Sequence, residues 1–144
     1  MIHCENVAKR FGEKTVLSGI NIDIPKRKIF GHLGPSGAGK TTLIKILTGQ
    51  LDYDRGNVRT LGKDVKSLTG EDKKKIGIMM DQFGVYERLS CFDNLKIFAN
   101  LYKIPSSRIY ENLELVELGD AVKKSASDLS KGMRQQTSGL WHRP

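Results

Sequence analysis

The stretch that decides the fold of this chain is Gly34-Pro35-Ser36-Gly37-Ala38-Gly39-Lys40-Thr41-Thr42. It fits the G-x-x-x-x-G-K-[ST] pattern at every fixed position, and in that pattern backbone N–H groups wrap the oxygens of a nucleotide's phosphates. The three glycines permit backbone angles and a close approach that a Cβ atom would block. Lys40 then supplies a positive charge to the β- and γ-phosphates, and the Thr41 hydroxyl can hold Mg²⁺.

The residues on either side of this loop predict a strand before it and a helix after it. Residues 28–33 read as a short buried strand, and Leu43, Ile46 and Leu47 have the i, i+3, i+4 spacing of a helix with one apolar face. The start of that helix offers free N–H groups and the positive end of its dipole to an anion. Strand, glycine-rich loop and helix in this order favour a phosphate site over a surface turn that matches by chance.

Length and composition indicate one folded domain rather than a disordered or membrane-spanning chain. The chain has 144 residues, 38% of them hydrophobic, and its apolar runs are too short for a transmembrane helix. No signal peptide is visible at the N-terminus. Cys4 and Cys91 lack the spacing of metal ligands and indicate a reducing compartment. The net charge of +8 suits nucleotide, anionic lipid or nucleic acid, although scattered solvated lysines are the simpler explanation.

The rest of the chain reads as strands first and helices later. Four segments have the polarity pattern of β-strands, and they are residues 2–7, 16–24, 57–61 and 76–80. Ser90 and Asp93 then have the spacing of a capping box in front of an apolar helical face. Further apolar residues recur at helical spacing, with Gly119 as the expected C-cap. The pattern predicts a sheet with a phosphate loop, followed by a helical segment.

Together these features resemble the ATP-binding domain of an ABC transporter, from residue 2 to about residue 136. Four landmarks occur in the family's order: Lys9-Arg10-Phe11-Gly12, the phosphate loop, residues 76–89 around the Q-loop, and Leu129-Ser130-Lys131-Gly132-Met133-Arg134-Gln135-Gln136. The phosphate loop alone indicates nucleotide binding. The similarity to the L-S-G-G-Q signature at this distance after it, with a helical segment between them, makes the identification specific.

The resemblance implies a nucleotide site that two ATP-binding domains complete together. Phe11 would stack on the adenine ring, residues 34–42 would hold the phosphates, and Lys40 would also act as a catalytic residue that stabilises the transferred charge. The signature, Leu129 to Met133, would open a helix so that Ser130 and Gly132 meet the γ-phosphate bound by the partner. ATP and Mg²⁺ are the implied cofactors.

Three positions depart from the family's pattern. Asp81 stands where the Q-loop glutamine is expected and is the predicted Mg²⁺ ligand of that loop, with Gln82 as the alternative if the loop shifts by one residue. A loop-capping role is the structural alternative for Asp81. Lys131 replaces the first signature glycine and brings a cation toward the partner's γ-phosphate. His32 occupies a usually apolar position, where we expect a neutral, hydrogen-bonded core histidine rather than a catalytic one.

Residues 137–144 also differ from the family, and the difference predicts a C-terminally truncated or frame-disturbed copy. In the family the signature helix continues, and a later strand ends in an aspartate that holds Mg²⁺ and a glutamate that polarises water. No residue here matches either carboxylate, so we expect little or no ATP hydrolysis. The strand that would lie beside residues 28–33 has no match either, so we expect an unpaired strand edge and poor folding.

The predicted fold class is therefore α/β: a P-loop NTPase core with an N-terminal antiparallel β subdomain and a helical insert, incomplete at the C-terminus. We predict one partial ATP-binding domain over residues 1–144. Its parts are a nucleotide-binding core with the β subdomain at 1–85, a helical subdomain at 86–128, the signature at 129–136 and an atypical tail at 137–144.

The function implied by the resemblance is that of the ATP-binding subunit of an ABC transporter, an ATPase that couples ATP binding and hydrolysis to transport. The implied partners are a membrane permease and either a second copy of the chain or another ABC ATPase domain. No nucleic acid is expected. The implied location is cytoplasmic, on the inner face of the cell membrane. Two alternatives stay open: a non-transport ABC-type ATPase that acts on nucleic acid or the ribosome, and a non-catalytic fragment.

Overall fold

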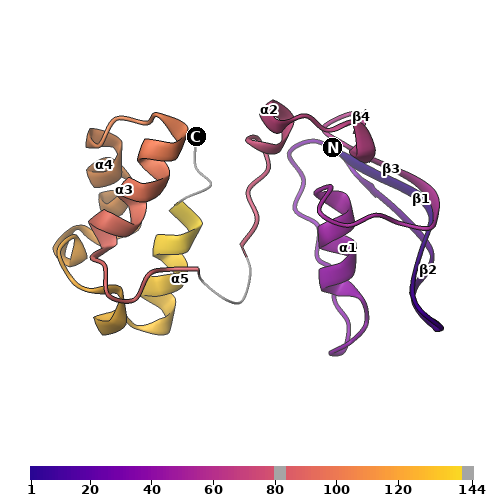
Figure 1. Ribbon diagram of the computed structural model, residues 1–144, viewed down its shortest axis with the longest axis horizontal. Helices are drawn as coiled ribbons and strands as arrows, with labels where there is room; N and C mark the ends of the chain where they lie inside the picture. The colour runs from indigo at the N-terminus through magenta and orange to yellow at the C-terminus, as the bar shows by residue number, and fades with distance from the viewer. Residues whose placement is uncertain (80–83, 141–144) are drawn as a thin grey trace. The chain divides into compact units, whose positions relative to one another are not determined.

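The computed structural model describes residues 1–79 and 84–140, which divide into two compact units, Met1–Ile76 and Gly77–Pro144 (Figure 1). Each unit has its own core of buried apolar side chains. Within the described residues, no helix combines the length and the apolar character that crossing a lipid bilayer requires.

The first unit is a four-stranded antiparallel sheet with helix α1 packed on it. The strand order is β2-β1-β3-β4. The bounds are Ile2–Phe11 for β1, Lys14–Ile24 for β2, Lys40–Leu47 for α1, Arg55–Thr60 for β3 and Lys63–Asp64 for β4. A short 3-10 turn at Val65–Ser67 and helix α2 at Gly70–Lys73 complete the unit. The predicted antiparallel β subdomain is confirmed, and so is the helix after the phosphate loop.

Strand β1 is irregular over its second half, toward the end that carries Phe11. The β1–β2 hairpin closes where Phe11 pairs with Lys14, and the register shifts between Val7 and Lys9 and again between Lys9 and Arg10. Each shift interrupts the regular ladder of backbone hydrogen bonds. Groups outside the β1–β2 pair are therefore needed to hold this end of the hairpin.

The buried strand predicted at residues 28–33 is not formed, and that prediction is wrong. Ile29 and Leu33 are 103% and 93% exposed, and these residues make no ladder with any strand of the sheet. A strand needs a neighbour to satisfy its backbone N–H and C=O groups, and no other described segment pairs with this one. His32 is exposed for the same reason, so it is not the core histidine that the sequence predicts.

The strand predicted at residues 76–80 is likewise absent over residues 76–79, and residue 80 lies outside the described part of the chain. Ile76 and Ile78 are half-buried, while Gly77 and Met79 are exposed. The apolar pattern correctly marks residues that seek burial, but a parallel strand also needs its neighbours in the sheet.

The second unit is helical. Its elements are α3 at Cys91–Tyr102, α4 at Ser107–Leu115, α5 at Lys131–Leu140, and two 3-10 turns at Gly119–Ala121 and Ala126–Asp128. Ser90 caps α3 as predicted, since its hydroxyl accepts a 3.0 Å hydrogen bond from the Asp93 N–H. Helix α5 extends to residue 140 and buries Thr137, Ser138 and Leu140.

Helix α4 ends differently from the sequence prediction, which named Gly119 as its C-cap. The helix ends at Leu115, and Glu117 takes the left-handed conformation with φ 60°. The Leu118 N–H then bonds to the Leu113 carbonyl at 2.8 Å, which closes the helix end in a Schellman motif. Gly119 instead begins the next 3-10 turn.

Asp72 ties helix α2 to the sheet through several hydrogen bonds. Its carboxylate accepts bonds from the Lys63 ammonium at 2.8 and 2.9 Å and from the Thr69 hydroxyl and N–H at 2.7 and 3.1 Å. The Lys63 hydrogen bond, followed by those from Thr69, holds the pKa of Asp72 well below its ordinary value. The carboxylate is therefore ionised at neutral pH.

A pH-dependent contribution of Asp72 to stability follows. A lowered pKa in the folded chain adds stability above the unfolded value of about 4, and this stability is lost as the pH falls below it. We expect wild type to be more stable than Asp72→Asn at pH 7 and the difference to shrink toward pH 3. Urea denaturation of both proteins at the two pH values measures this, and a difference that does not change with pH would contradict it.

Candidate nucleotide site

The phosphate loop is a tight turn that rests on strand β2. Gly37 and Gly39 adopt left-handed angles, φ 80° and 84°, and the Ala38 N–H bonds to the Pro35 carbonyl at 3.3 Å. A Cβ atom at Gly39 would lie 2.8 Å from Leu17 Cδ2 and 3.0 Å from the carbonyl oxygen of residue 16. Glycine at this position is therefore required both by the backbone angle and by the close approach of the loop to the sheet.

Lys40 is folded back over the loop. Its ammonium donates hydrogen bonds of 2.7 Å each to the carbonyl oxygens of Gly34 and Pro35. Because an ammonium group has three N–H donors, these two bonds leave one directed away from the carbonyls. The arrangement places a positive charge inside the curve of the loop, where a phosphate group would lie.

The N-terminus of α1 adds further donors at the same place. The Leu43 N–H is bonded to the Gly39 carbonyl at 2.9 Å, and helix geometry leaves the N–H groups before it without intrahelical acceptors. The first turn holds no acidic residue that would repel an anion. The Thr41 side chain is exposed and Thr42 is half-buried, so the Thr41 hydroxyl is accessible to a metal ion bound beside the phosphates.

Phe11 lies at the end of β1, where the β1–β2 hairpin closes. Lys9 pairs with Leu17, the residue against which Gly39 packs, and Phe11 pairs with Lys14 beyond it. The Phe11 ring is 49% exposed. An aromatic side chain that is open to solvent can stack on a purine.

The signature residues lie in the second unit, at the start of α5. Ser130 caps this helix, because its hydroxyl accepts a 3.2 Å bond from the Met133 N–H. The prediction that the signature opens a helix is confirmed. Leu129 is buried, while Lys131 and Gly132 are exposed. Ser130, Gly132 and Met133 line a shallow surface depression together with Met79, Gln135 and Gln136.

The two predicted Q-loop ligands, Asp81 and Gln82, lie outside the described residues. Their role as Mg²⁺ ligands therefore stays a prediction.

Among the residues that the structure describes, no group of three or more His, Cys, Asp or Glu side chains gathers to hold a metal ion. Burial raises the pKa of the Cys4 and Cys91 thiols, which fits protonated packing residues. A metal here would be held mainly by the nucleotide's phosphates, as is usual for Mg²⁺.

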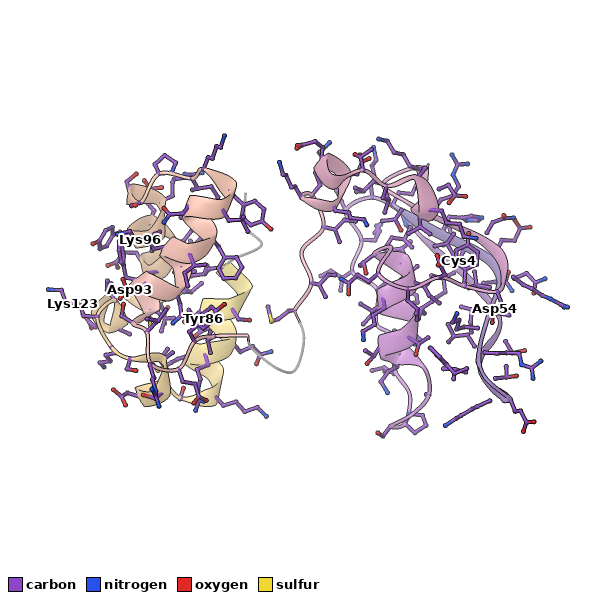
Figure 2. The ribbon with its side chains drawn as sticks, in the orientation of Figure 1. Cys4, Asp54, Tyr86, Asp93, Lys96 and Lys123 are labelled. Atoms are coloured by element: carbon purple, nitrogen blue, oxygen red, sulfur yellow. The ribbon has the colours of Figure 1, made fainter. Side chains whose placement is uncertain are left out.

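Asn94 anchors the segment that follows the Q-loop, a role that the sequence analysis missed. Its side chain is fully buried. Its oxygen accepts the Tyr86 N–H at 2.8 Å, and its amide group donates to the carbonyls of Tyr86, Leu89 and Ser90 at 3.0, 3.2 and 2.9 Å. Tyr86 is labelled in Figure 2. The sequence offered one signal for this role, which is that Asn94 is a polar residue on an otherwise apolar face of the predicted helix.

Asp54 is the second residue that the sequence analysis did not assign to the site. It lies in the turn before β3 and contacts the end of β1 next to Phe11. The sequence shows it only as part of a turn-rich segment, Asp52-Tyr53-Asp54-Arg55-Gly56. Its partners are distant in sequence, so the pattern of residues gives no sign of the contact.

Comparison with known proteins identifies the family to which the chain belongs. Residues 17–138 match the family model described as ABC transporter. The chain is 34% identical over 136 residues to the lantibiotic transport ATP-binding protein SrtF of Streptococcus pyogenes. This alignment covers 94% of this chain and 58% of that protein. It is 35% identical to the methionine import ATP-binding protein MetN of Clostridium acetobutylicum, over 96% of this chain and 46% of that protein. The chain thus spans about half the length of the curated relatives it matches.

The fold also agrees with a solved structure. The dimeric structure of a post-hydrolysis state of the ATP-binding cassette MJ0796, bound to ADP and Pi, superposes with a TM-score of 0.79 at 23% identity. The superposition covers 99% of this chain and 68% of that one. The predicted α/β fold, with its antiparallel sheet and helical segment, is confirmed.

Proposed function

Since the chain belongs to the ABC transporter family, we propose that it binds Mg-ATP through residues 34–42 and Phe11, as the ATP-binding part of a transporter. The observation that carries the proposal is the loop with Lys40 folded over the Gly34 and Pro35 carbonyls. The loop offers positive charge and free helix N–H groups, and it packs against β2, whose partner strand β1 carries the exposed Phe11. This set of groups fits the triphosphate and the base of one nucleotide.

The chain's own residues have distinct tasks in this proposal. Backbone N–H groups of the loop hold the phosphates, and Lys40 neutralises charge on the β- and γ-groups. Thr41 offers its hydroxyl as one Mg²⁺ ligand, and Asp81, or Gln82, offers another. When bound, Mg²⁺ supplies charge that stabilises the phosphate oxygens. The site holds its ligand through backbone groups, so affinity depends on loop shape as much as on side chains.

We further propose that a second ATP-binding domain completes the site. The supporting observation is that Ser130 and Gly132 begin α5 beside exposed Lys131, where an anion bound by a partner would meet N–H groups and a cation. The related MJ0796 structure is dimeric. A membrane permease is the proposed further partner, which would place the chain at the cytoplasmic face of the membrane.

We infer that these 144 residues bind ATP far better than they hydrolyse it. Lys40 can stabilise a transferred phosphoryl group, but attack by water also needs a group that orients the water molecule. Neither carboxylate that the family uses near Mg²⁺ has a match in this sequence. The relatives' names specify different cargoes, a lantibiotic and methionine, so the proposal names no transported molecule.

Titration calorimetry with Mg-ATP tests the proposal. We expect saturable binding by wild type and an affinity loss of tenfold or more in Lys40→Ala, because a hydrogen bond to a charged group contributes roughly 1.5–3 kcal/mol. Lys45→Ala is the matched control, since Lys45 lies in the last turn of the same helix. Circular dichroism checks that each variant is folded. Equal affinity in Lys40→Ala and Lys45→Ala would contradict a phosphate site at this loop.

A further inference from the structure

Asp54 holds residues 8–10 of strand β1 at three points. Its carboxylate accepts a 2.6 Å hydrogen bond from the Arg10 N–H and a 3.4 Å bond from the Lys9 ammonium. Its own backbone N–H donates to the Ala8 carbonyl at 2.9 Å. Figure 2 labels Asp54 beside the strands of the sheet. The turn before β3 therefore fastens the stretch of β1 that leads directly into Phe11.

Lys9 links this carboxylate to the aromatic ring. Its ammonium lies 5.3 Å from the centroid of the Phe11 ring, within the range of a cation–π contact. The Lys9 side chain is only 13% exposed, so it occupies a well-packed position rather than a mobile one. Lys9 lies over one face of the ring, and because Phe11 is 49% exposed, part of its surface stays open to solvent.

Asp54 contacts β1 where its pairing with β2 is irregular. The β1–β2 register shifts on both sides of Lys9, so regular ladder bonds are interrupted next to Phe11. The Arg10 N–H bond, the largest cause, holds the pKa of Asp54 below its ordinary value. The carboxylate is thus ionised at neutral pH and available as a charged acceptor. Asp54 supplies a fixed point that the irregular strand does not provide.

We propose that Asp54 is a positioning residue for the nucleotide's base, because it holds the hairpin end that carries Phe11 in the orientation for stacking on a purine. This rests on the nucleotide site proposed above. Asp54 itself does not touch the nucleotide in this proposal. Its contribution to affinity is therefore specific to the base and passes entirely through Phe11.

Titration calorimetry of the full chain with two ligands, Mg-ATP and tripolyphosphate, separates base binding from phosphate binding. In Asp54→Ala we expect affinity for ATP to fall about threefold to tenfold, part of what stacking of a base on an aromatic contributes. Affinity for tripolyphosphate should not change. In a Phe11→Ala background, Asp54→Ala should cause no further loss. Asp52→Ala is the matched control, because it removes an exposed carboxylate of the same turn.

Asp54→Asn keeps an oxygen acceptor for the Arg10 N–H and should recover part of the ATP affinity, which supports the proposal even if Asp54→Ala folds poorly. Three results would overturn it: equal losses for both ligands, a full effect of Asp54→Ala in the Phe11→Ala background, or no effect of Phe11→Ala while binding still requires Lys40. The last result leaves the proposed phosphate site intact. Wild type that binds neither ligand would overturn the proposed function together with this inference.

Discussion

Replacing Gly56 with alanine is expected to lower the free energy of unfolding of the sheet by about 3 kcal/mol or more, an effect in the range of severe backbone substitutions. Gly56 has φ 94°, a left-handed angle that side chains disfavour. A Cβ atom there would lie 2.4 Å from the Glu5 carbonyl oxygen and 2.5 Å from that of Asn6. Backbone atoms cannot move aside as a flexible side chain can, so strands β1 and β3 would have to separate.

Gly62→Ala is the control for this prediction. Gly62 has a similar angle, φ 82°, but the atom nearest to a Cβ added there is the Met1 side-chain Cε, 4.0 Å away. Its loss should be about 1 kcal/mol, the cost of the backbone angle alone. Hydrogen exchange of β1 and β3 amides in both variants measures the difference. Equal losses of unfolding free energy in the two variants would show that the close approach of β1 and β3 does not contribute to the cost of the substitution.

Replacing Asn94 with alanine is expected to destabilise the helical unit by about 2–4 kcal/mol, since it removes the acceptor of the Tyr86 N–H and one hydrogen bond from each of three backbone carbonyls. The fully buried side chain makes four hydrogen bonds with the segment before α3. Alanine also leaves a space where the amide group was. The segment from Tyr86 to Leu89 should then lose its fixed path.

Asn100→Ala provides the comparison, because Asn100 is an exposed residue on the same helix. This change should alter stability by less than about 0.5 kcal/mol, as is usual for surface positions. Urea denaturation followed by helical circular dichroism measures both variants. A loss in Asn94→Ala as small as that in Asn100→Ala would mean that water replaces the lost hydrogen bonds and that Asn94 does not organise the segment.

The sequence predicted the elements that local residues can specify. The β1–β2 hairpin follows from a period-two pattern across a short turn, and α1 and α3 follow from apolar spacing and, for α3, a cap at Ser90. The strands predicted at residues 28–33 and, over its described residues 76–79, at 76–80 are not formed, because a strand depends on neighbours that its own residues do not supply. The exposed position of His32 follows from the first of these failures.

The same distinction between features set by local residues and features set by distant ones holds for the site. The glycine spacing predicted backbone angles and a close approach that a Cβ atom would block, and Gly37 and Gly39 have positive φ angles while Gly39 packs closely on β2. Asp54 could not be found in this way, because its partner Arg10 is 44 residues away. Contacts over such separations are created by the fold, and a turn-rich sequence gives no measure of them.

The two hydrogen bonds from Lys40 to the Gly34 and Pro35 carbonyls have a consequence for the free energy of ligand binding. These two bonds tie the start of α1 to the Gly34 and Pro35 carbonyls and so restrict the conformations open to the loop. Fixing one residue's backbone costs about 1–2 kcal/mol of conformational entropy. A loop that is already ordered pays this cost during folding rather than at the moment of association, so more of the interaction energy appears as affinity. Preorganisation of this kind lets a short, exposed loop compete with water for a highly charged ligand.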